Sequence, residues 1–155
     1  TGAKRILARK VFLDTSFALA TANRQDVHHQ RAKILASAIS TRQSHIITTQ
    51  AVLCEIGNYF SRTEERRLAV ALIDSYERDP SVTIVPVSDA LYQRGFALYR
   101  ARLDQDWSLT DCISFVVMDD EAIIDGLTHD KHFEQNGGRA LLRDTYYDTA
   151  NRPTY

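Results

Sequence analysis

The sequence has no apolar run long enough to cross a bilayer, and it contains only two cysteines, Cys54 and Cys112. A membrane-spanning helix needs about 20 consecutive apolar residues, and stretches such as 113–118 are far shorter. Two cysteines at this separation match neither a disulfide framework nor a metal finger. These absences exclude a membrane span and predict reduced, buried thiols in a cytoplasmic protein.

A strong net charge is absent as well. The 155 residues include 19 basic and 20 acidic side chains, for a formal net charge of -1, so the chain as a whole has no general attraction to nucleic acid. Its basic residues are mostly Arg, whose planar guanidinium suits phosphate, and a local RNA-binding patch is compatible with this composition. Residues 1–10 are basic but lack the apolar core of a signal peptide.

Short buried strands alternate with amphipathic helices along the chain. Apolar runs predict strands at 10–13, 46–48, 82–85, 123–127 and 140–142. Helical spacing of apolar residues predicts helices at 27–39, 51–60, 63–79, 89–102 and 108–118, with short helices after Asp14 and Asp130. This alternation, without repeats or linkers, is typical of one α/β domain in which helices cover both faces of a parallel sheet.

Four acidic residues occupy positions that such a fold can bring together. Asp14 and Asp130 each follow a predicted strand, and sites in open parallel sheets form beyond the carboxyl ends of the strands. Glu55 and Asp111 lie early in predicted helices that can face the same edge. Because carboxylate oxygens are the usual protein ligands of Mg²⁺ and Mn²⁺, these four residues predict a divalent-metal site.

Each of these acids also has an ordinary structural explanation. Asp14 suits the N-cap of a helix, and Glu55 falls on the polar face of its own helix. Asp111 completes the Ser-Leu-Thr-Asp pattern of a capping box, and Asp130 can begin the turn after its strand. No single acid therefore identifies a site, and the prediction rests on the four together.

Other residues near these positions have two interpretations each. Trp107 can stack on a base or anchor its loop. His129 and His132 are surface residues or members of a His-based metal site.

Four segments place the acids within specific motifs: VFLDTS at 11–16, VLCEIGN at 52–58, SLTDCISF at 108–115 and THDKHF at 128–133. Together they resemble the PIN-domain ribonucleases, and their order and spacing are similar to those of the VapC-type toxins of type II toxin–antitoxin systems. The resemblance runs from about Val11 to Leu142. It implies a three-layer α/β/α sandwich with a central, mostly parallel sheet, and divides the chain into a basic leader (1–10), a PIN domain (11–143) and a polar C-terminal tail (144–155).

The resemblance also implies a function, namely metal-dependent hydrolysis of RNA phosphodiester bonds by an endoribonuclease. Asp14, Glu55, Asp111 and Asp130 would be the catalytic residues and would bind Mg²⁺ or Mn²⁺. A small antitoxin protein and a second copy of the chain in a homodimer are the implied partners. Neighbouring polar support would come from Thr15, Ser16 and Thr110.

Three arginines follow Glu55 closely, and we consider them as RNA contacts. Arg62, Arg66 and Arg67 can pair with phosphates, although a solvated charged helix face is the favoured interpretation. Their role depends on whether RNA reaches this part of the surface.

Other classes of protein fit the sequence less well. A haloacid-dehalogenase phosphohydrolase needs a second Asp two residues after the first, where this chain has Ser16. A receiver-type signalling domain needs an acidic pair near the end of its first strand, where only Asp14 is present. The remaining alternative is a PIN-fold RNA-processing or binding protein with little intrinsic catalysis, and metal-dependent turnover of RNA distinguishes it from a nuclease.

Overall fold

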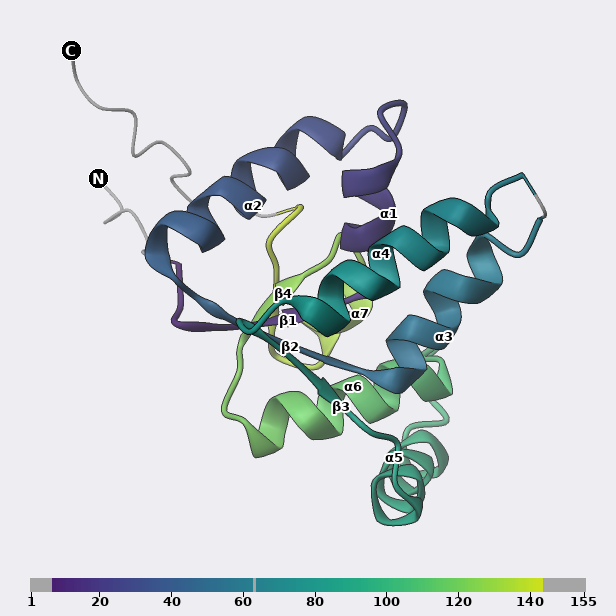
Figure 1. Ribbon diagram of the computed structural model, residues 1–155. Coiled ribbons are helices and arrows are strands. Elements are labelled where there is room, and N and C mark those ends of the chain that lie inside the picture. The colour runs from purple at the N-terminus through teal and green to yellow at the C-terminus, as the bar shows by residue number, and fades with distance from the viewer. Residues whose placement is uncertain (1–6, 63, 144–155) are drawn as a thin grey trace, which may run out of the picture.

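The computed structural model describes residues 7–62 and 64–143, which alternate between strand and helix (Figure 1). The strands are β1 (Lys10–Leu13), β2 (His45–Thr49), β3 (Val82–Val85), β4 (Asp125–Leu127) and β5 (Arg139–Ala140). The helices are α1 (Thr15–Ala22), α2 (His29–Arg42), α3 (Gln50–Tyr59), α4 (Arg66–Arg78), α5 (Asp89–Ala101), α6 (Leu109–Asp120) and α7 (Lys131–Gln135).

The five strands form one parallel sheet in the order β3-β2-β1-β4-β5. The chain first adds β2 and β3 on one side of β1, and then adds β4 and β5 on its other side. The strand order therefore reverses between β1 and β4. Open parallel sheets form ligand sites beyond the carboxyl ends of the strands at such a switch point.

The central strand β1 supplies side chains to two separate cores. Val11 and Leu13 pack in one core with residues of α1 and α2, such as Leu35. Phe12 points the other way, because successive side chains of a strand face opposite sides of the sheet, and packs with residues of α3, α6 and α7, such as Phe115. Helices thus cover both faces of the sheet (Figure 1), which confirms the three-layer α/β/α prediction.

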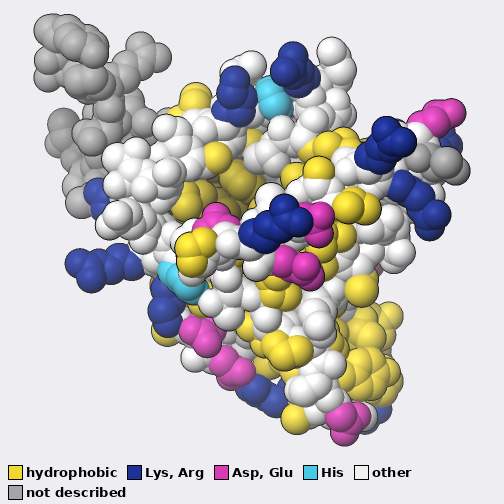
Figure 2. All heavy atoms as spheres, in the orientation of Figure 1, with side chains coloured by type: hydrophobic (Ala, Val, Ile, Leu, Met, Phe, Trp, Pro, Cys, Tyr) yellow, Lys and Arg dark blue, Asp and Glu magenta, His cyan; other side chains and the backbone are white. Residues whose placement is uncertain are grey.

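Helix α6 is buried on almost every side, as its apolar sequence predicts. Helix α5 packs against it at Gly95, where an added Cβ would lie 2.5 Å from Cγ1 of Ile113. The outer face of α5 carries Tyr92, Phe96 and Tyr99, whose successive rings stack with centroids 6.2 and 6.3 Å apart. Figure 2 shows hydrophobic side chains gathered on the surface near this helix.

Several predicted boundaries are wrong. The helix expected from Val27 begins at His29, because residues 23–29 form a turn with backbone bonds to the Asn23 and Asp26 carbonyls and leave Val27 91% exposed. The helix expected from residue 63 begins at Arg66, and residue 63 is not described. The last two strands occupy only 125–127 and 139–140.

The prediction of buried thiols is confirmed for Cys112 and wrong for Cys54, which is exposed. Helix α3 turns Val52, Leu53 and Ile56 toward the core and leaves Cys54 on its outer side. Most of the predicted leader (1–6) and all of the predicted tail (144–155) lie outside the described residues. Within the described ranges, no helix combines the length and the apolar character needed to cross a membrane.

Candidate active site

A cavity of about 310 Å³ lies among residues that follow the carboxyl ends of β1 and β4 and residues of α3 and α6. All four acids predicted as a metal site contribute to it. Its lining consists of Asp14, Thr15, Ser16, Leu19, Glu55, Asp106, Ser108, Asp111, Asp130 and His132. The fold therefore brings together carboxylates that are far apart in the sequence, at the switch point of the sheet.

Asp14 directly follows β1 and is 6% exposed. It occupies the N-cap position of α1, but its side chain makes no capping hydrogen bond. Its Oδ2 instead accepts hydrogen bonds from the hydroxyls of Thr128, at 2.7 Å, and Ser16, at 3.2 Å. Because Thr128 follows β4, the carboxylate is fixed across the two strands at the switch point, and capping does not explain it.

The charge of Asp14 is poorly compensated. Burial raises the pKa of this carboxyl to about 6, the Thr128 hydrogen bond opposes the rise, and the nearby charges of Asp111 and Glu55 add to it. None of the ion pairs among the described residues includes Asp14. A bound cation would therefore stabilise the charged form of this side chain.

Asp111 forms the capping box that its sequence pattern predicts. Its backbone N–H donates to Oγ of Ser108 at 3.0 Å, and its Oδ2 accepts from the Ser108 backbone N–H at 3.0 Å. Burial raises the pKa of Asp111, the bond from Ser108 N–H opposes this, and the charge of Asp130 raises it further. The structural and functional explanations are compatible here, because the cap fixes the orientation of a carboxylate that lines the cavity.

Glu55 is half-buried, so the alternative interpretation, a glutamate on the solvated polar face of its helix, does not hold. Thr15 Oγ1 donates a hydrogen bond of 2.6 Å to Glu55 Oε2, which joins the start of α1 to the middle of α3. The hydroxyl of Thr15 thus contacts Glu55, and the hydroxyl of Ser16 contacts Asp14. Thr110 differs, because it is not among the described residues that line the cavity.

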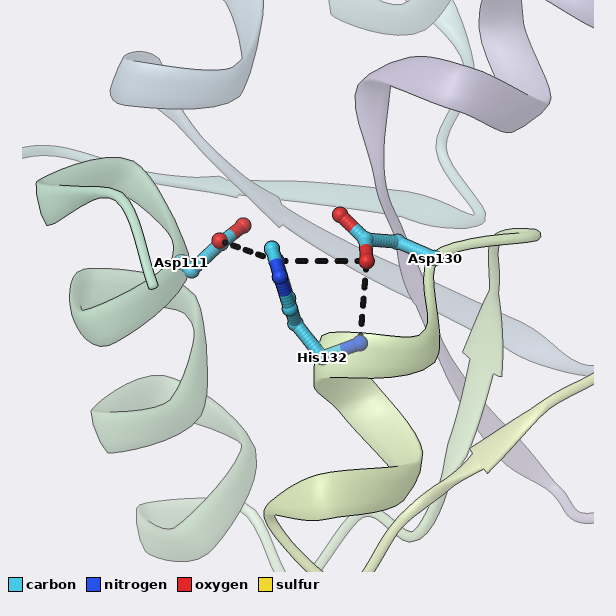
Figure 3. A group of neighbouring side chains, drawn as sticks. All are labelled: Asp111, Asp130 and His132. Atoms are coloured by element: carbon cyan, nitrogen blue, oxygen red, sulfur yellow. Dashed lines mark hydrogen bonds and ion pairs between the residues drawn. The ribbon is translucent and has the colours of Figure 1, made fainter. Parts of the chain in front are cut away.

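Asp130 and His132 lie at the start of α7, as Figure 3 shows. Oδ1 of Asp130 accepts a hydrogen bond of 2.9 Å from the backbone N–H of His132 and so caps this helix. Nδ1 of His132 lies 3.2 Å from both Oδ1 of Asp130 and Oδ2 of Asp111. The neighbouring His129 is exposed and stacks on His28 with ring centroids 4.8 Å apart.

Sequence reasoning did not assign Thr128 or Asp106 to the site. Thr128 belongs to the THDKHF motif, and its position after a strand was the available signal. Asp106 lines the cavity from a polar loop without any recognisable pattern.

Trp107 does not stack on a base from an open surface, because it is 4% exposed, packs edge-on against Phe115 and donates to Gln135. The anchoring interpretation of this residue is correct.

The three arginines considered as RNA contacts are exposed, and none of them lines the cavity. Arg62 follows α3, whereas Arg66 and Arg67 begin α4. They stay candidates for contacts with a bound RNA outside the cavity.

The family model of the PIN domain matches residues 11–138. The chain belongs to the PIN domain family. This PIN domain is also similar to the crystal structure of VapC20 from Mycobacterium tuberculosis, with a TM-score of 0.73 and 26% sequence identity, over 83% of this chain and 96% of that chain. VapC20 is described as a sarcin-ricin loop cleaving toxin. No curated protein matches the sequence significantly.

Membership in the PIN family excludes the haloacid-dehalogenase and receiver alternatives for this chain. The donor set of the PIN cavity suits a divalent cation, because carboxylate oxygens are the ligands that hard cations prefer. Neither Lys nor Arg is among the described lining residues, so no fixed side-chain cation in the lining neutralises the four acids. The residues present therefore fit a metal site.

Proposed function

We propose that this PIN domain is a metal-dependent endoribonuclease that hydrolyses RNA phosphodiester bonds and acts as a VapC-type toxin. The observation that carries the proposal is the convergence of Asp14, Glu55, Asp111 and Asp130 on one cavity at the switch point of the sheet. Mg²⁺ or Mn²⁺ is the cofactor of this proposal, because both ions are bound by carboxylates and by the phosphate oxygens of a substrate.

The side chains of the cavity have distinct parts in this reaction. A bound divalent ion would supply positive charge that stabilises the phosphate in the transition state and lowers the pKa of a water molecule. Asp14 and Asp111 would hold the ion, and their carboxylates are oriented by the Thr128 hydroxyl and the Ser108 N–H. Glu55, fixed by Thr15, would orient the attacking water, and Asp130 would complete the set of acids around the ion.

The test is cleavage of RNA by purified protein that is free of antitoxin. The protein is incubated with structured and single-stranded RNA in Mg²⁺ or Mn²⁺, with EDTA as the control. Cleavage only in the presence of metal supports the nuclease, whereas binding of RNA without cleavage under all metal conditions supports the alternative of a binding protein. Mapping of the cut ends then identifies the site of cleavage.

For the substrate, we propose a structured RNA loop. Similarity to VapC20 supports this choice, since that toxin is described as cleaving the sarcin-ricin loop. A hairpin with the sarcin-ricin sequence therefore belongs among the RNAs tested. Equal cleavage of the hairpin and of an unstructured RNA of the same composition would contradict the choice.

For the partners, we propose a small antitoxin and a homodimer. The exposed aromatic face of α5 supports a protein contact, because Tyr92 and Tyr99 are 39% and 43% exposed and Leu103, just beyond the helix, is 86% exposed. Apolar surface of this kind marks interaction sites in soluble proteins. Light scattering of the purified chain tests the dimer, and a monomeric wild type at micromolar concentration would contradict it.

We further propose that residues 11–143 form the catalytic domain and that the protein acts in the cytoplasm. The PIN match over 11–138 supports the extent of the domain. Expression of residues 11–143 alone tests it, and the truncated chain is expected to retain metal-dependent cleavage.

A further inference from the structure

The imidazole of His132 lies between two carboxylates of the cavity, and the proposed mechanism gives it no part. Its Nδ1 is 3.2 Å from Oδ2 of Asp111 and 3.2 Å from Oδ1 of Asp130, and the side chain is 19% exposed. We infer that His132 Nδ1 is itself a metal ligand, together with Asp111 and Asp130, and that the site prefers a first-row transition-metal ion over Mg²⁺. The inference rests on the proposed function only in placing a divalent ion among these acids.

The spacing of the three ligand atoms suits one ion. They all lie within 4.8 Å of one another, and Figure 3 shows the ring of His132 reaching toward both carboxylates. Imidazole nitrogen and carboxylate oxygen bind transition metals at about 2.0 to 2.2 Å. Adjacent atoms of one tetrahedral or octahedral shell are then about 2.8 to 3.6 Å apart, and the two separations of 3.2 Å from His132 fall in this range.

Hydrogen bonding alone is a poorer explanation of the same arrangement. Nδ1 of an imidazole carries at most one proton, so it donates well to only one of the two carboxylate oxygens. Oδ2 of Asp111 already accepts from the Ser108 backbone N–H, and Oδ1 of Asp130 already accepts from the backbone N–H of His132. A shared cation, in contrast, interacts favourably with both oxygens and with the nitrogen lone pair.

The same backbone bonds prepare the ligands for an ion. The Ser108 N–H fixes Asp111 at the start of α6, and the His132 N–H fixes Asp130 at the start of α7. Outer hydrogen bonds of this kind orient metal ligands and contribute to affinity. Two of the three ligand atoms are therefore anchored by main-chain hydrogen bonds.

The nitrogen ligand determines which ion is preferred. Mg²⁺ binds almost exclusively to oxygen and water, whereas imidazole is a common ligand of first-row transition metals. A site built from two carboxylates and one imidazole therefore discriminates against Mg²⁺ more than a site of carboxylates alone. His132 is the residue that sets this preference.

Mn²⁺ is the probe for the experiment, because electron spin echo spectroscopy detects a ¹⁴N nucleus bound to this ion. The full chain is loaded with Mn²⁺ as wild type, His132→Ala, His132→Asp and His129→Ala. His129→Ala is the matched control, since that exposed imidazole stacks on His28 and does not line the cavity. Calorimetric titration gives the dissociation constants for Mn²⁺ and Mg²⁺, and circular dichroism checks the fold.

We expect ¹⁴N coupling in the wild type and in His129→Ala, and none in His132→Ala or His132→Asp. His132→Ala weakens Mn²⁺ binding at least about tenfold and weakens Mg²⁺ binding less. His132→Asp restores Mn²⁺ binding through oxygen and lowers the ratio of Mn²⁺ to Mg²⁺ affinity, which excludes misfolding as the cause. Wild-type protein that binds no Mn²⁺, bound Mn²⁺ without ¹⁴N coupling, or an unchanged affinity ratio in both folded His132 variants overturns the inference.

This experiment separates the inference from the proposed function. Metal-dependent RNA cleavage without ¹⁴N coupling rejects His132 as a ligand and leaves the nuclease in place. Coupling that depends on His132, in a protein that cleaves no RNA, supports the ligand and rejects the nuclease.

Discussion

Buried acidic side chains have different partners at the two edges of the parallel sheet. We call these the amino edge, where the strands begin, and the carboxyl edge, where they end. At the amino edge, Asp125 begins β4, is 2% exposed and pairs at 3.3 Å with Arg139, which begins β5. Lys10 begins β1 and pairs with Glu121 at 3.0 Å. At the carboxyl edge, Asp14 is nearly as buried as Asp125, but its carboxylate accepts hydrogen bonds from hydroxyls and faces further acids.

The difference indicates which buried acids serve stability and which serve binding. A buried carboxylate with a guanidinium partner is compensated within the fold, so removing its charge breaks a buried ion pair. A buried carboxylate among other acids is unfavourable in the folded chain until a cation binds. We therefore expect substitutions at the two edges to separate stability from activity.

The largest effect is expected at the carboxyl edge. Asp14→Asn and Asp111→Asn each keep the size of the side chain and remove a charge that, in the proposed function, holds the metal. Each is expected to lower the rate of RNA cleavage at least about 100-fold, as measured under single-turnover conditions in Mg²⁺ and Mn²⁺. Cleavage at the wild-type rate by a folded variant would show that the carboxylate is not part of the reaction.

At the amino edge, Asp125→Asn is expected to change stability and to leave cleavage nearly unaffected. Breaking a buried ion pair costs about 3 to 5 kcal/mol, and we expect about 3 kcal/mol because the Arg139 side chain is 32% exposed. Urea unfolding measures the loss, and cleavage at a temperature where the variant is folded provides the comparison. A stable but inactive variant would contradict the proposal that the amino edge affects stability and the carboxyl edge affects activity.

The pKa of Asp14 predicts an opposite change in stability. The folded-state pKa of about 6 lies above the ordinary value of 3.8, so the folded chain binds more protons between these values. Stability therefore falls as the pH rises through this window, by about 3 kcal/mol in total. In EDTA at pH 7, Asp14→Asn should be more stable than the wild type, and the difference should disappear near pH 4. Urea unfolding across this range tests the sign.

A smaller effect is expected from the hydroxyl that supports Asp14. Burial raises the pKa of Asp14 and the Thr128 hydrogen bond opposes the rise, so Thr128→Val should raise this pKa further. The acidic limb of the pH–rate profile should move to higher pH, and stability should fall by about 1 to 2 kcal/mol. Thr110→Val, next to Asp111 in the sequence but outside the lining of the cavity, is the control. An unmoved acidic limb in Thr128→Val would mean that Asp14 does not govern it.

The sequence predicts the fold and most of the acidic residues at the carboxyl edge of the sheet, because both depend on periodic patterns. Strands at 10–13 and 82–85 have the predicted bounds, and the carboxyl end of a parallel strand places Asp14 at an edge without knowledge of its neighbours. The capping box likewise specifies the local geometry of Asp111. Local rules thus determine which residues reach the edge.

The remaining features depend on packing between elements. Cys54 and Glu55 are neighbours on α3, and the packing of this helix against the core and α1 places Glu55 at the cavity and leaves Cys54 exposed. The position of Asp106 depends on how its loop packs after α5. The orientation of the His132 ring is set by two helices, α6 and α7, that are separate in the sequence.

The smallest effect is expected beyond the cavity, at Arg62, Arg66 and Arg67. If the RNA extends from the carboxyl edge over this surface, each Arg→Ala change should weaken RNA binding only about threefold and lower the slope of log affinity against log salt by about 0.7. The rate of the bound complex should be unchanged, because no arginine lines the cavity. Arg78→Ala, at the far end of α4, is the matched control. If the slope of log affinity against log salt is unaltered in all three variants, the RNA contacts other parts of the carboxyl edge. If the cleavage rate of the bound complex falls, an arginine takes part in the reaction itself.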